Sequence, residues 1–121
     1  MVFVAMALLL ALAVQAPIDV TGKWDGEITG ERADGTMNQD SALLILTQKD
    51  RTITGTAGGD ESDRNPITSG TIDGNKISLV VMHERNKREF KIELTVEGDE
   101  MKGTVVAGER RGQIALKKRK E

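Results

Sequence analysis

The stretch Val20-Thr-Gly-Lys-Trp-Asp-Gly-Glu-Ile-Thr-Gly30 decides how this chain of 121 residues folds. Its even positions carry mostly apolar or small residues, among them Trp24, and its odd positions carry polar or charged ones. Alternation with a period of two is typical of a β-strand that has one buried face and one face in water. We therefore predict a strand over residues 20–31, with the only tryptophan on its buried face. Glycines on that face leave room where neighbouring strands bend and cross.

The rest of the chain repeats the same unit, a short strand followed by a turn. Asp73-Gly74-Asn75 is the strongest hairpin turn, and residues 89–97 show the cleanest alternation. Between residues 41 and 48 both faces are apolar, so the period alone does not say which face points inward. The strands predicted after the first cover residues 41–48, 52–57, 67–72, 76–82, 89–97, 101–107 and 112–118.

Eight short strands without an intervening helix predict an all-β, eight-stranded antiparallel up-and-down barrel, because closure removes exposed strand edges. A β-sandwich is the alternative. The spacing of residues 46–56 matches that of residues 94–104, as expected for a meander of consecutive hairpins. We expect one domain over residues 17–121.

The first residues indicate export. Residues 2–14 are an unbroken apolar run, and Val14-Gln15-Ala16 precedes Pro17, which predicts a signal peptide over residues 1–16 with cleavage after Ala16. The run lacks a preceding Lys or Arg, and it is shorter than the roughly 20 residues of a membrane span. A helix packed on the domain is the alternative. We expect a secreted or periplasmic protein that meets the membrane only through this peptide.

Composition excludes several classes of function. The net charge of −2 gives no electrostatic basis for nucleic-acid binding, and the absence of cysteine removes disulfides and thiol redox chemistry. Beyond the predicted signal peptide the aromatic residues are Trp24 and Phe90, too few for a stacking platform or a pocket rich in aromatic rings. No cofactor is predicted.

Gly22-Lys23-Trp24 on a first strand, followed by about eight strands, resembles the start of calycin-type barrels, the relatives of lipocalins and avidins. In lipocalins this tryptophan closes one barrel end and packs against a basic side chain from the last strand. The resemblance implies that role for Lys118, which shares its parity with Ile114 and Leu116, or alternatively for Arg119. The pattern over residues 20–118 also resembles uncharacterised secreted β-barrel proteins of bacteria, which imply no activity.

The chain departs from both named relatives. Nothing in it predicts the helix that follows the lipocalin barrel, and avidins line their ligand site with several tryptophans where this chain has one. The resemblance therefore implies a barrel, and it does not imply binding of biotin or lipid.

Four residues are candidates for ligand binding: Trp24, Gln48, Arg64 and Lys118. Trp24 is either the floor of a pocket or a plug that fills the barrel end, and an eight-stranded barrel has an interior that side chains can just fill. Asn38 and Gln39 are further polar residues for an open mouth, with ordinary loop chemistry as the alternative.

No catalytic or metal-binding constellation is predicted. His83 is the only histidine, and it falls in a charged turn without a recognisable nucleophile or second metal-binding histidine. Asp60, Glu61 and Asp63 miss the spacing of a calcium loop, so we expect a soluble acidic loop.

These observations predict a non-catalytic binding module for a small apolar ligand or a protein partner. The alternatives are a calycin-like enzyme, with Trp24 and Arg64 in the barrel mouth, and a structural domain associated with the cell envelope. The presence of a cavity discriminates among them. A barrel filled by large apolar side chains leaves no room for a ligand. The residues that could fill it are Leu44, Leu46, Ile53, Ile92, Leu94 and Leu116.

Overall fold

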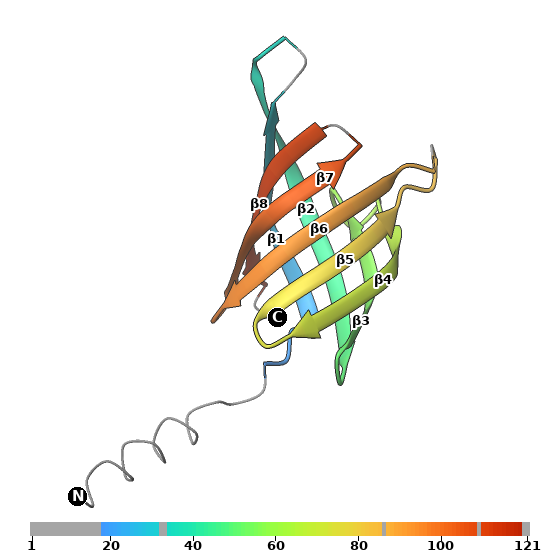
Figure 1. Ribbon diagram of the computed structural model, residues 1–121, viewed down its shortest axis with the longest axis vertical. Helices are drawn as coiled ribbons and strands as arrows, with labels where there is room; N and C mark the ends of the chain where they lie inside the picture. The colour runs from blue at the N-terminus through green and yellow to red at the C-terminus, as the bar shows by residue number, and fades with distance from the viewer. Residues whose placement is uncertain (1–17, 32–33, 86, 109, 120–121) are drawn as a thin grey trace, which may run out of the picture.

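The computed structural model describes residues 18–31, 34–85, 87–108 and 110–119, and within these ranges the chain forms eight β-strands and no helix. Each strand pairs antiparallel with the next, and β8 pairs with β1, so the sheet is a closed barrel (Figure 1). The predicted barrel is confirmed, and the sandwich alternative is wrong. The strands are β1 (Gly22–Glu31), β2 (Met37–Lys49), β3 (Thr52–Gly58), β4 (Asn65–Asp73), β5 (Lys76–Met82), β6 (Glu89–Glu97), β7 (Glu100–Ala107) and β8 (Arg110–Lys118).

The predicted signal peptide over residues 1–16 lies outside the described residues. In the part of the chain that the structure describes, no helix is long and apolar enough to cross a membrane.

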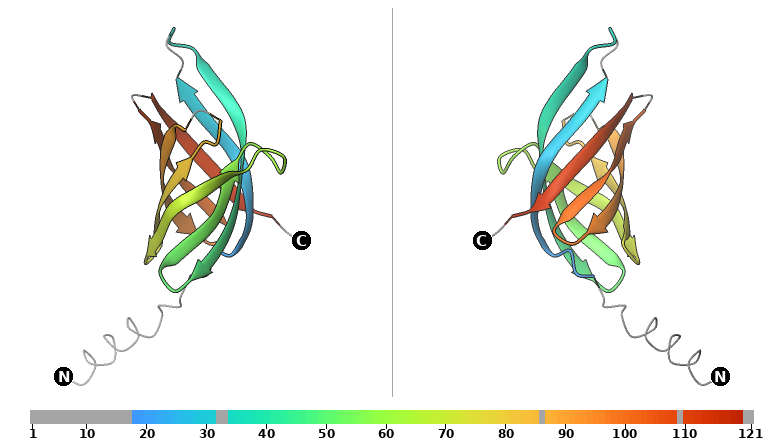
Figure 2. Two further views of the ribbon diagram at one scale, coloured as in Figure 1. Left: turned by 90° about the vertical axis from the view of Figure 1, so that its right-hand side faces the viewer. Right: turned by 90° about the vertical axis from the view of Figure 1, so that its left-hand side faces the viewer.

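Four strands begin earlier than the sequence predicts: β2, β4, β7 and β8. β2 starts at Met37 because its ladder with β1 continues to the pair Glu31–Met37, so β1 and β2 project beyond the rest of the barrel (Figure 2). β4 starts at Asn65 and includes Pro66, which was expected in a loop. Proline is tolerated there because Pro66 lies at the start of β4 and its pair with Thr56 borders the irregular part of the β3–β4 pairing.

The closed barrel decides which face of β2 points inward. Leu44 and Leu46 belong to the hydrophobic core inside the barrel. Leu43 is also buried, but it is not part of this core. Leu43 instead lies with Asp60 and Glu61 around a shallow hollow on the outside of the barrel. The loop between β3 and β4 thus covers an apolar outer face that would otherwise meet water, and Figure 2 shows this loop standing out beside β1 and β2.

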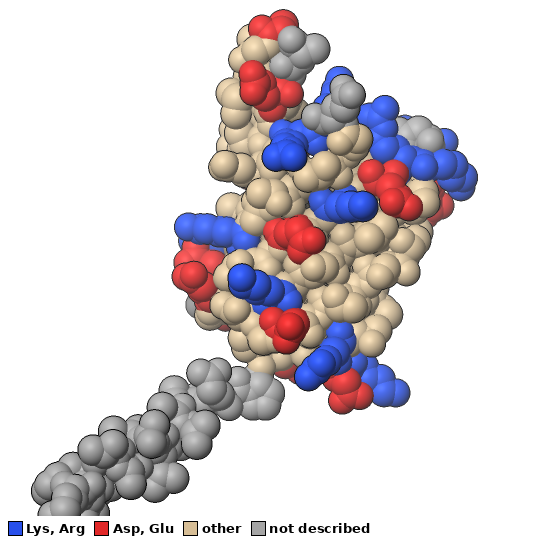
Figure 3. All heavy atoms as spheres, in the orientation of Figure 1, with Lys and Arg blue, Asp and Glu red and all other residues tan. Residues whose placement is uncertain are grey.

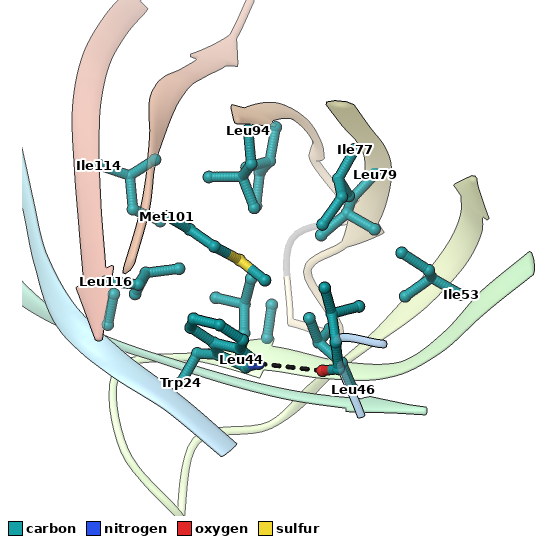
Figure 4. Packing of buried hydrophobic residues seen from close by; sticks show 14 of the residues in the cluster. Trp24, Leu44, Leu46, Ile53, Ile77, Leu79, Leu94, Met101, Ile114 and Leu116 are labelled. Atoms are coloured by element: carbon teal, nitrogen blue, oxygen red, sulfur yellow. Dashed lines mark hydrogen bonds between the residues drawn. The ribbon is translucent and has the colours of Figure 1, made fainter. Parts of the chain in front are cut away.

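One end of the barrel is closed by tight turns and by Trp24. Its side chain is 1% exposed, and the indole Nε1 donates a hydrogen bond of 2.9 Å to the Val20 carbonyl oxygen (Figure 4). The Nζ atom of Lys118 lies 5.9 Å from the centre of the ring, within the range of a cation–π contact. The predicted packing of a basic side chain on Trp24 is confirmed for Lys118.

Arg119, the alternative, points elsewhere. Its guanidinium pairs with Asp25 at 2.8 Å and with Glu61 at 3.3 Å, and Lys23 pairs with the same Glu61 carboxylate at 2.7 Å. These ion pairs fasten the β3–β4 loop to β1 and to the end of β8.

Gly26 marks a close approach of two strands. A Cβ atom placed on this glycine would lie 1.9 Å from the carbonyl oxygen of Ala115 on β8. No side chain fits there without moving the backbone, which agrees with the expectation that inward glycines of the first strand make room for a neighbouring strand.

Candidate functional site

The end of the barrel opposite Trp24 is hollow. A cavity of about 370 Å³ opens there, at the end that carries the β1–β2, β3–β4 and β5–β6 connections. Ligand pockets typically measure about 300–1,000 Å³, so this cavity has room for a small molecule. Its apolar lining consists of Ile28, Ala42, Leu44, Ala57, Val81, Phe90, Ile92, Val105 and Ile114.

The barrel is filled in one half and open in the other. All six residues that could have filled it are buried, as Trp24 and Met101 also are in the packed half shown in Figure 4. Leu44 and Ile92 belong both to this core and to the cavity wall, so they form the floor on which a ligand would rest. The core therefore closes the cavity on the side of Trp24 and leaves the opposite half of the barrel interior open.

A buried asparagine organises the rim. Asn65 is 7% exposed, and it is the one buried polar residue among those described. Its Nδ2 donates to the Ala57 carbonyl oxygen at 3.1 Å, and its Oδ1 accepts from the Glu84 amide at 3.1 Å. A second contact of Nδ2 reaches Asp63 Oδ1 at 3.4 Å. Asn65 thus links β3 to the β3–β4 and β5–β6 loops. Its amide nitrogen and oxygen already make hydrogen bonds within the protein.

His83 and Ser41 also line the cavity, and the structure does not bring them together as a catalytic pair. The Nδ1 atom of His83 accepts from the Arg85 amide at 3.3 Å, and its ring stacks on Phe90 with centroids 6.3 Å apart. The Ser41 hydroxyl donates to the Gly59 carbonyl oxygen at 2.9 Å. A serine nucleophile needs a base that accepts its proton, and here the proton points to a backbone carbonyl.

A second hollow of about 410 Å³ adjoins the first, and the two share Ile28, Phe90 and Val105. Its outer side is polar and basic. The polar and charged residues that line it are Glu31, Asn38, Arg88, Arg110 and Arg111.

Three of the four residues predicted to bind a ligand lie together at the closed end. Trp24 and Lys118 form the cation–π pair, while Gln48 accepts from the Val20 amide at 2.9 Å and donates to the Asp50 carbonyl at 3.1 Å. Arg64 lies in the β3–β4 loop, where its Nε donates to the Glu61 carbonyl at 2.9 Å. The lining of the open cavity includes none of these four, so their ligand-binding role stays a prediction.

The other polar candidates divide between the two faces of β2. Asn38 lines the second hollow, whereas Gln39 donates a hydrogen bond to the Glu27 carboxylate on the neighbouring strand. Of these two described residues, Asn38 lines a hollow at the barrel mouth and Gln39 lies on the outer face.

The acidic loop is held by internal contacts. The hydroxyl of Ser62 donates to Asp60 at 2.7 Å and lowers the pKa of that carboxyl, and the hydrogen bond and charge of Lys23 lower the pKa of Glu61. Within the described ranges, no three His, Cys, Asp or Glu side chains are placed to hold a metal ion.

Comparison with known proteins supports the class of fold. The chain is similar in structure to a "secretary abundant heat soluble (SAHS) protein" from Ramazzottius varieornatus, crystallised from a dimer sample, with a TM-score of 0.52. The match covers 87% of this chain and 98% of the other at 12% sequence identity. This likeness concerns the fold, the closed antiparallel barrel. No family model and no curated protein matches the sequence.

Proposed function

We propose that this protein is a secreted or periplasmic, non-catalytic barrel that binds a small apolar molecule in its open half. The observation that carries the proposal is the cavity of about 370 Å³ above a floor of buried side chains. Removing apolar surface from water supplies the driving force for such binding. The likeness to another calycin-like barrel is consistent with this use of the fold.

Enzymatic activity is not part of the proposal because the polar groups of the cavity are committed to the fold. Asn65 and Ser41 bind backbone groups, and the described hydrogen bonds give His83 no acidic partner. The two carboxylates that line the cavity also accept hydrogen bonds, Asp40 from the Asn38 side chain at 2.9 Å and Asp63 from the Gly59 amide at 3.1 Å. If the protein is instead a structural domain, the cavity should bind no ligand. A direct measurement of binding therefore distinguishes this alternative from the proposed binding function.

The experiment is a titration with N-phenyl-1-naphthylamine, an uncharged apolar fluorophore. We expect saturable binding to the wild type and its loss in Ala57→Phe or Val105→Phe, which place a ring in the cavity. Ala115→Phe is the matched control, since Ala115 is exposed on the outer face of β8. Circular dichroism checks the fold of each variant. Absence of saturable binding to the wild type, or equal binding by Ala57→Phe and Ala115→Phe, would contradict the proposal.

A protein partner is the second candidate, favoured by the projecting β1–β2 hairpin. Met37 on this hairpin is 63% exposed, and β2 pairs with β3 only from Leu43 onward. An exposed strand edge can accept a further strand. A partner bound there would be retained by wild-type protein purified from its own host and lost in Met37→Glu, while binding of the fluorophore stays unchanged.

A further inference from the structure

The second hollow places arginine side chains directly above apolar ones. Arg110 and Arg111 begin β8, and Arg88 immediately precedes β6. All three line the hollow that shares Ile28, Phe90 and Val105 with the apolar cavity.

The strand period directs Arg110 toward the barrel axis. On β8 the inward residues are Ile114 and Leu116, and Arg110 shares their even parity. Arg110 pairs with Ala107 on β7, which lines the same hollow. Figure 3 shows Lys and Arg side chains gathered toward this end of the molecule, with acidic side chains among them.

The charge balance of this part of the rim is positive. Glu31 lines the hollow as well, and Glu89 lies beside Arg88 and Arg110 on its outer side, while Glu109 is outside the described residues. Within the described ranges neither Arg110 nor Arg111 makes an ion pair. Arg88 already has an interaction partner, and Arg111 has the odd parity of the outward residues of β8, so Arg110 carries the inference.

We infer that the ligand is a single-chain amphiphile with an anionic head group, its tail in the apolar cavity and its head group on Arg110. The guanidinium group binds carboxylate, sulfate or phosphate oxygens through paired hydrogen bonds. A cavity of about 370 Å³ is near the lower end of the usual range for ligands, which suits one chain. This inference rests on the proposed function and adds the chemistry of the ligand to it.

Isothermal titration of the purified protein with four ligands of equal chain length tests the inference. The probes are decanoate, decyl sulfate, decanol and decyltrimethylammonium. We expect both anions to bind more tightly than decanol and the cation to bind most weakly. In Arg110→Ala the anions should lose about ten-fold or more in affinity, the scale of one charge-assisted hydrogen bond, with decanol unchanged.

Two controls keep the result interpretable. Arg51→Ala removes an exposed arginine at the closed end and should leave all affinities unchanged. Raising the salt concentration should weaken the binding of decanoate to the wild type and not that of decanol, which tests the charge contribution without any variant.

The outcomes separate the two proposals. Equal affinity for decanoate and decanol, or an unchanged affinity of Arg110→Ala for the anions, overturns the anionic head group and leaves the apolar site intact. Failure of all four probes to bind overturns the proposed function itself. Binding to dioleoylphosphatidylglycerol vesicles that depends on Arg110, with no binding of free decanoate or decyl sulfate, would assign this arginine to a membrane surface and overturn the inference.

Discussion

Replacement of Trp24 tests whether this residue is a plug that stabilises the barrel or part of the binding site. Trp24 is 1% exposed, donates to the Val20 carbonyl and lies at the end opposite the cavity. Trp24→Ala should cost about 3–5 kcal/mol, because truncating a buried aromatic side chain loses its burial and leaves a void. That is a large part of the about 5–15 kcal/mol that stabilises a typical domain.

Trp24→Phe separates packing from hydrogen bonding. The ring remains apolar, but the Val20 carbonyl loses its donor, which should cost about 1–3 kcal/mol for an unpaired buried group. Lys118→Met removes only the cation over the ring and should cost about 0.5–1 kcal/mol, since Lys118 is exposed.

The assay is urea unfolding followed by far-ultraviolet circular dichroism, because these variants at position 24 lack the tryptophan fluorophore. Binding of N-phenyl-1-naphthylamine by folded Trp24→Phe should equal that of the wild type. If Trp24→Phe unfolds at the wild-type urea concentration but binds the fluorophore more weakly, the assignment of Trp24 to the plug is refuted and the residue belongs to the ligand site.

Three further changes test other parts of the structure. Gly26→Ala should cost about 1–3 kcal/mol, measured as a lower urea midpoint, because its Cβ would collide with the backbone of β8, whereas Gly74→Ala has no such neighbour and should lose only the small cost of a positive φ. Asn65→Ala should cost about 1–3 kcal/mol in the same assay, since the Glu84 amide and the Ala57 carbonyl lose their partner, and an unchanged midpoint would contradict its role at the rim. Lys23 lowers the pKa of Glu61, so this carboxylate contributes stability above the ordinary carboxyl pKa and loses it as the pH falls. The wild type should therefore lose more stability than Glu61→Gln between neutral pH and about pH 3.5, and equal losses would refute the contribution of this pair.

The candidate site was less accessible to sequence reasoning than the fold. Asn65 was placed in a loop and His83 in a solvated turn, whereas both line the cavity wall. Arg110 and Arg111 fall in the turn before the strand predicted over residues 112–118. Their convergence with Phe90 depends on which strands become neighbours around the barrel, and no local pattern reports that.

The sequence by itself determined the strands and the barrel, because a period of two fixes the two faces of each strand wherever that strand lies. The contact of a basic side chain with Trp24 was implied by the resemblance to calycin-type barrels, which left Lys118 and Arg119 as alternatives. Tertiary structure alone decided which apolar face of β2 enters the core, since Leu43 is buried by a loop that ion pairs hold in place. It also decided that half of the interior is open. The space left inside a barrel depends on how side chains from all eight strands meet across it, and that is a property of their three-dimensional packing.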